Sequence, residues 1–195
     1  MRPVERSEIL SLGDYESIRE PFRARVIREK KQRRVDFGPK ASCLFENHDT
    51  VLLQIQEMLR TERITREASV LHEIETYNAL IPGPGELSAT VMIAIADVGE
   101  RDSFLVAAEG FERHVALSVG GELFPARFEA GRALTGRTSA VHYFRFPLGE
   151  VAMKYVRDTP PRNADLRLVS QHEVYRVEER LPAELVAHIR EDLEP

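Results

Sequence analysis

The sequence predicts an α+β fold in which helices pack on a mainly antiparallel sheet. Apolar side chains recur at helical spacing in residues 1–85, whereas residues 86–195 contain alternating and β-branched segments. The run Pro82-Gly83-Pro84-Gly85 separates the two parts, because neither residue type sustains a helix. Gly120-Gly121 lies between two strand-like segments and supplies the positive φ angles of a tight hairpin turn. Helices followed by hairpin-linked strands are typical of the α+β class.

The first helix is predicted to extend from a cap at Asp14 to about residue 34. Pro21 lies inside this segment and removes one backbone hydrogen bond. We therefore expect either a kink at Pro21 or a new helix that starts with Pro21 in its first turn. Gly38-Pro39 ends the segment, and residues 41–45 are short and apolar enough to form a strand.

A helical hairpin is predicted next. Asn47 or Asp49 caps a second helix over about 49–62, and Thr65 caps a third helix over about 66–80. Each of the two helices carries apolar side chains on one face. We expect the hairpin to be antiparallel and to cover the sheet.

The part after residue 86 is predicted to be mainly β structure. Strands are expected over residues 87–96, 114–119, 122–128, 139–146 and 166–170. A short helix is expected near residues 102–108, and a C-terminal helix begins at Pro182 and ends near Leu193. The chain has no internal repeats, and we interpret residues 1–195 as a single domain.

Composition excludes several classes of protein. The 195 residues, with 43% hydrophobic and 30% charged side chains, are typical of a globular domain with a proper core. The single cysteine, Cys43, excludes an internal disulfide and a cysteine-based zinc or iron–sulfur site built by this chain alone. The longest apolar run, residues 91–96, is far shorter than the roughly 20 residues of a membrane span. We expect a soluble, unexported, cytoplasmic protein without a membrane partner.

Charge is unevenly distributed along the chain. The net charge of −5 argues against general affinity for nucleic acids. Residues 23–34 nevertheless contain seven Lys or Arg and one acid, and residues 171–195 contain seven acids and three bases. No aromatic side chains that could stack on bases are interleaved with the basic stretch. We interpret it as the solvent face of the first helix, attracted to an acidic patch in the C-terminal segment or on a redox partner.

Four separated motifs occur in order along the chain: Phe45-Glu46-Asn47 and residues 54–59, 75–82 and 86–90. In these motifs the sequence resembles an uncharacterised bacterial family, domain of unknown function 3501. Arg2-Pro3-Val4 and Ser139-Ala140-Val141 extend the similarity to almost the whole chain. The resemblance implies no activity, so no residue inherits a role from it. The genes of this family tend to lie beside genes for rubrerythrin-like proteins and iron–sulfur oxidoreductase subunits. This implies redox or oxidative-stress work and one of these proteins as a partner.

Polar side chains lie between apolar ones throughout these motifs. The candidates for a ligand site or polar network are Glu46, Asn47, Gln54, Glu57, Asn78 and Glu86. If they are buried, they must be hydrogen-bonded or bound to a ligand. A structural interpretation has Asn47 capping a helix, Gln54 and Asn78 binding loop backbone, and Glu57 paired with Arg60 or Arg63. The alternative is a pocket for a ligand or partner.

One metal site can be considered. His72 and Glu75 lie three residues apart on the third helix and share a face. With Glu46 and Glu57 they could complete a shell for a divalent transition metal such as iron, manganese or zinc. A solvated helix face explains His72 equally well, and we favour no metal and no other cofactor. The other histidines, His114, His142, His172 and His188, show no ligand spacing.

We therefore expect a non-catalytic accessory or interaction protein in a bacterial redox or oxidative-stress pathway. Its polar network would hold the hairpin against the sheet, and no catalytic residue is assigned. The alternative is a metal- or small-molecule-binding enzyme that uses the carboxylates and His72 on the hairpin. An enzyme is expected to show carboxylates that converge in a pocket without charge partners, whereas a scaffold is expected to show each one paired. A homo-oligomer is compatible with the sequence.

Overall fold

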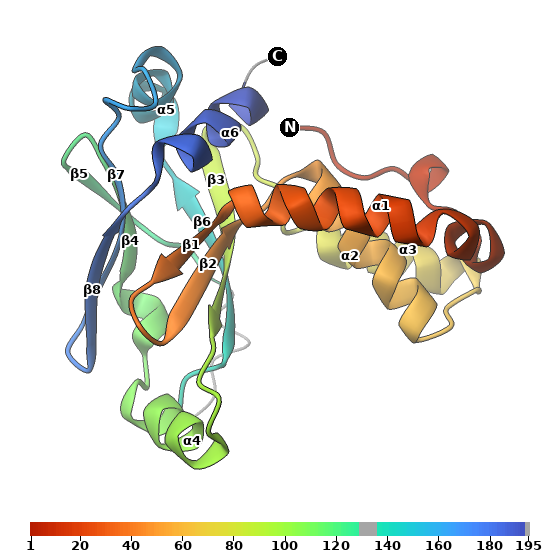
Figure 1. Ribbon diagram of the computed structural model, residues 1–195, viewed down its shortest axis with the longest axis horizontal. Helices are drawn as coiled ribbons and strands as arrows, with labels where there is room; N and C mark the ends of the chain where they lie inside the picture. Colours follow the sequence, from red (N-terminus) through yellow and green to blue (C-terminus); the bar gives the residue numbers. More distant parts are fainter. Residues whose placement is uncertain (129–135, 194–195) are drawn as a thin grey trace.

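The computed structural model describes residues 1–128 and 136–193, and it shows a body of two sheets with a helical arm extending from it (Figure 1). One sheet has the order β1 (Arg34–Phe37), β2 (Ala41–Phe45), β3 (Glu86–Ile93) and β6 (Val141–Pro147). The other has the order β5 (Glu122–Pro125), β4 (Val115–Val119), β7 (Leu166–His172) and β8 (Tyr175–Arg180). All neighbouring strands are antiparallel, which confirms the predicted α+β class.

The two sheets enclose one apolar core, in which Phe37, Leu117, Phe144 and Leu166 are fully or almost fully buried. At one edge an antiparallel bridge between Arg127 and Arg145 joins the segment after β5 to β6. At the opposite edge the Tyr175 hydroxyl on β8 donates to the Phe37 carbonyl on β1 and accepts a 3.0 Å bond from the Lys40 amide. The sheets therefore cover each other.

Three further helices belong to the body: α4 (Val98–Ala107), α5 (Gly149–Asp158) and α6 (Ala183–Leu193). Two short 3-10 helices, η1 (Arg6–Glu8) and η2 (Phe111–His114), complete the secondary structure of the described residues. No helix of the described residues has the length and apolar character needed to cross a membrane. Gly120 and Gly121 have positive φ angles of 59° and 89°, which confirms the predicted turn between β4 and β5.

The arm consists of α1 (Leu12–Gln32), α2 (His48–Thr61) and α3 (Glu67–Asn78). The predicted hairpin forms, but its apolar residues pack mainly in a second cluster of their own. In this cluster Val51, Ile55 and Ile74 meet Val4 and Ile9 of the N-terminal segment. The structure has two antiparallel sheets where one is expected, and the N-terminal segment supplies much of the apolar surface that the hairpin buries. The prediction of one domain over residues 1–195 stays a prediction.

The N-terminal caps of the helices agree with the sequence prediction for α2 but not for α1 and α3. Asn47 caps α2 as predicted, and it accepts a 2.9 Å bond from the Thr50 amide. Ser11, not Asp14, caps α1, since its hydroxyl accepts from the Asp14 amide at 3.2 Å. The predicted Thr65 cap is also wrong, because Arg66 occupies the cap position of α3 without a side-chain bond. Pro21 lies inside one continuous α1, so no new helix begins there.

A buried ion pair joins the arm to the body. Arg33, which is 3% exposed, follows α1 and donates two 2.6 Å bonds to Asp192 on α6 and one 3.1 Å bond to Glu29. The side-chain amide of Asn47 donates through Nδ2 to the same Glu29 oxygen at 2.5 Å. Burial raises the pKa of the Asp192 carboxyl, and the Arg33 guanidinium opposes that shift. The expected attraction between the basic first segment and the acidic C-terminal segment is thus confirmed at Arg33 and Asp192.

Replacing Arg33 by methionine is expected to destabilise the protein by on the order of 3 kcal/mol, because Asp192 keeps a buried charge without its cation. Denaturant unfolding of variant and wild type measures this difference. Arg60→Met is the matched control, since Arg60 pairs with Glu16 at the surface and such pairs contribute little. Equal unfolding midpoints for Arg33→Met and wild type would contradict the prediction.

Candidate functional site

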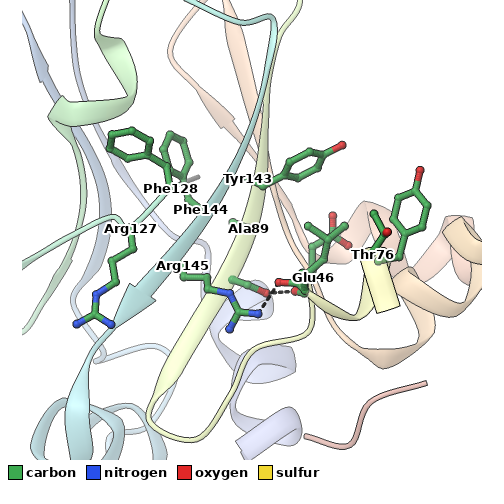
Figure 2. A pocket seen from close by; sticks show the side chains of 12 residues that line it. Glu46, Thr76, Ala89, Arg127, Phe128, Tyr143, Phe144 and Arg145 are labelled. Carbon is green, nitrogen blue, oxygen red and sulfur yellow. Dashed lines mark hydrogen bonds between the residues drawn. The ribbon is translucent and has the colours of Figure 1, made fainter. Parts of the chain in front are cut away.

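A cleft of about 250 Å³ lies where the arm meets the outer face of β3 and β6 (Figure 2). The arm contributes Tyr77, Ala79 and Leu80, from the end of α3 and the residues that follow it. The exposed surface of the lining is mostly apolar, and Glu46, Ser88, Arg127 and Arg145 add polar groups to it. Concave sites of this composition are the usual binding sites for small organic ligands.

The strand register determines which side chains of the body face the arm. Side chains alternate between the two faces of a strand, and Phe144 belongs to the apolar core between the sheets. Its neighbours Tyr143 and Arg145 therefore project from the other face, toward α3. They pair with Thr90 and Ser88 across β3. The outer face of these two strands is thus polar at the place where the arm leaves a gap.

Glu46, one of the candidates for a polar network or ligand site, lines the cleft. Its carboxylate forms no ion pair in the described part of the chain. Glu46 is 8% exposed and follows β2 directly. Its two oxygens accept bonds of 2.5 Å from the Thr50 hydroxyl and 2.6 Å from the Thr90 hydroxyl. Both partners are neutral, so the negative charge of Glu46 is not compensated within the described residues.

Two arginines also line the cleft. Arg145 donates to the Glu86 carboxylate and to the backbone carbonyls of Ala79 and Ile81, the last at 3.2 Å. Arg127 is exposed and makes no side-chain hydrogen bond or ion pair with any described residue. The cleft therefore carries negative charge at Glu46 and an uncompensated positive charge at Arg127.

Tyr77 and Tyr143 add aromatic surface to the cleft. Tyr77 forms a side-chain hydrogen bond with Gln54, which was predicted to bind loop backbone. Burial is the main cause that raises the pKa of the Tyr77 hydroxyl. The phenol is therefore neutral at pH 7 and can both donate and accept a hydrogen bond.

The remaining polar candidates connect parts of the arm or its junction with the body. Asn78 forms two 2.9 Å bonds with the backbone of Val4, one as donor and one as acceptor. Glu86 accepts a 2.8 Å bond from the Gly83 amide in addition to its pair with Arg145. The predicted role of Asn78 in binding loop backbone is confirmed, and a role of these residues in ligand binding stays a prediction.

Glu57 lies on the side of α2 that faces α1. It accepts bonds of 2.8 and 2.9 Å from Arg19 and a 2.7 Å bond from the Tyr15 hydroxyl. The predicted pairing with Arg60 or Arg63 is wrong, because Arg60 turns to Glu16. The bond from Arg19 is the largest cause that lowers the pKa of Glu57.

The four candidate metal ligands do not converge. His72 and Glu75 are exposed on α3, Glu57 is paired with Arg19, and Glu46 lies at the end of β2. Within residues 1–128 and 136–193, no three His, Cys, Asp or Glu side chains come close enough to hold a metal ion. The structure therefore does not bring together the shell that the sequence suggested.

A second polar cluster is not predicted by the sequence, in which the histidines show no ligand spacing. The Thr138 hydroxyl donates to Glu112 at 3.0 Å and lies 3.1 Å from Nε2 of His142. His114 and His172 come together with ring centroids 5.2 Å apart. Thr138, Glu112 and His142 are all buried. Burial is the main cause that lowers the pKa of His142, although Glu112 opposes it.

Arg127, Tyr77, Tyr143 and Arg145 were also missed as candidates for the cleft. The alternating aromatic segment over 139–146 signals a strand, but it does not tell which of its faces meets the arm. No local signal marks Arg127. Its place beside Arg145 depends on pairing between segments that are distant in the sequence.

Comparisons with known proteins show similarity over nearly the whole chain. Residues 3–193 match the model of a family described as "Protein of unknown function (DUF3501)". A crystal structure of a novel protein of unknown function from Burkholderia pseudomallei K96243 superimposes with a TM-score of 0.90 and 31% sequence identity. The match covers 99% of this chain and 100% of that chain. No curated protein matches the sequence.

Glu57→Ala is expected to lower the free energy of unfolding by on the order of 1–3 kcal/mol, because Tyr15 loses its buried acceptor. Urea unfolding of the variant and of wild type checks this. Glu16→Ala removes a carboxylate from the neighbouring surface pair and serves as the control. An unchanged midpoint for Glu57→Ala would mean that the bonds to Tyr15 and Arg19 do not stabilise the arm.

The free energy of unfolding is expected to decrease as the pH falls below about 6.5, the ordinary pKa of a histidine side chain. The folded state holds His142 at a lowered pKa, so the unfolded chain binds the proton more readily and gains from acid. Removing this group in His142→Gln should flatten the loss between neutral and mildly acidic pH. Unfolding free energies measured across this range test the prediction, which fails if the two curves stay parallel.

Proposed function

This chain belongs to the DUF3501 family of proteins of unknown function, and we propose that it is a non-catalytic binding protein that holds a small organic ligand in the cleft. The observation that supports this function is the mostly apolar cleft of about 250 Å³ between α3 and β6, whose lining includes one carboxylate and two guanidinium groups. Such a cleft can enclose an apolar molecule and orient its polar groups.

The polar side chains around the cleft favour binding over catalysis. Nucleophilic catalysis needs a hydroxyl or thiol beside a base that activates it. Ser88 in the cleft instead donates its hydroxyl to the Leu80 carbonyl at 2.5 Å. The described lining contains no histidine or cysteine, and the threonines that contact Glu46 are themselves buried. The carboxylates Glu57 and Glu86 have arginine partners, as expected for a scaffold.

The accessory role in a bacterial redox or oxidative-stress pathway is part of this proposal. The family resemblance implies a cytoplasmic partner such as an iron–sulfur oxidoreductase or a rubrerythrin-like protein. Arg23, Arg28 and Lys31 on α1 support a protein partner with an acidic surface. All three are exposed, and none makes an ion pair with a described residue. Complementary charge of this kind accelerates and orients protein association.

Ala79→Phe is expected to weaken binding of the uncharged dye N-phenyl-1-naphthylamine at least about tenfold, because the added ring occupies the cleft. The fluorescence increase of the dye measures its affinity, and the chain contains no tryptophan that would interfere. Ala24→Phe places the same ring on the exposed side of α1 and is the control. The proposal is overturned if wild type does not bind the dye, or if the two variants bind it equally well.

A further inference from the structure

We propose that the ligand of the cleft is an organic anion with an apolar body, whose acidic head contacts Arg127 beside Arg145. This inference rests on the proposed binding function and specifies the class of ligand. Two observations support it. A backbone bridge places the two arginines side by side, and Glu86 pairs with Arg145 but not with Arg127.

The bridge places both guanidinium groups on one face. The Arg127 amide donates to the Arg145 carbonyl at 2.7 Å, and the Arg145 amide donates to the Arg127 carbonyl at 2.9 Å. Two residues that exchange both backbone bonds lie directly opposite each other, and their side chains leave the same face. Like charges in this position repel each other and destabilise the pair. Figure 2 shows both arginines at the cleft, with the end of the Arg127 side chain turned away from that of Arg145.

Among residues 1–128 and 136–193, only one of the two positive charges has a carboxylate partner. Arg145 is engaged by Glu86 and by the carbonyls of Ala79 and Ile81. Arg127 is exposed and has no carboxylate or carbonyl partner for its side chain among the described residues. An anionic group beside Arg127 would relieve the repulsion and form a charge-assisted hydrogen bond with a free guanidinium.

The rest of the cleft determines the body of the ligand. Leu80, Phe128 and the tyrosines Tyr77 and Tyr143 supply apolar and aromatic surface. The Glu46 carboxylate, which also lines the cleft, repels a second negative charge. The cleft therefore favours a monoanion with its acid group at one end over a molecule with acid groups at both ends.

Two dyes with the same ring system test the inference on the full-length protein. 1-Anilinonaphthalene-8-sulfonate carries one sulfonate, and N-phenyl-1-naphthylamine lacks it. Wild type is expected to bind the sulfonate dye more tightly, and added salt should reduce this preference. Arg127→Gln should weaken the sulfonate dye about tenfold, the effect of one charge-assisted contact, and leave the uncharged dye unaffected.

Arg162→Gln is the matched control, because Arg162 is exposed and does not line the cleft. It should leave the binding of both dyes unchanged. If Arg127→Gln changes neither dye, or changes both equally, the inference is wrong. The proposed function still stands in that case, provided that Ala79→Phe blocks the uncharged dye. If wild type binds neither dye, the proposed function and the inference both fail.

Discussion

The buried ion pair between Arg33 and Asp192 is the contact on which the geometry of the cleft depends. It lies where α1 ends, where α2 begins and where α6 covers the body, so it fixes the arm relative to the sheets. A buried guanidinium is tolerated only when its donors are satisfied, and here Glu29 and Asp192 accept three of its bonds. Asn47 connects this pair to the cap of α2, so the start of that helix depends on the same contact.

The arm is stiffened by polar contacts that link its helices and the N-terminal segment. Asn78 bonds with the backbone of Val4, Gln56 accepts a 2.6 Å bond from the Leu10 amide, and Glu57 binds Tyr15. These bonds surround the apolar cluster of the arm, which shares no residue with the core between the sheets. Two separately packed units thus form the walls of the cleft, and the bonds from Ser88 and Arg145 to the chain after α3 connect them.

Local signals in the sequence identified elements better than they identified contacts. The α2 cap at Asn47 and the turn at Gly120 depend on neighbouring residues, so the sequence was sufficient to predict them. Asp14 was mistaken for a cap because Ser11, three residues earlier, has the same capping chemistry and lies where the helix begins. The second sheet and the His142 cluster depend on pairing across long stretches of chain. Spacing along the sequence carries no information about such pairing.

The two arginines of the cleft differ in the hydrogen-bond partners of their side chains, and this difference determines which one is available to a ligand. Arg145 holds the end of α3 against β6, since it donates to the Ala79 and Ile81 carbonyls while it pairs with Glu86. A ligand that drew Arg145 away would leave a partly buried carboxylate and carbonyls without their donor, which costs free energy. The Arg127 side chain has no hydrogen-bond or ion-pair partner among the described residues, and the backbone bridge to Arg145 fixes its main chain. The backbone bridge thus holds Arg127 at the edge of the cleft, where its guanidinium has no partner among the described residues.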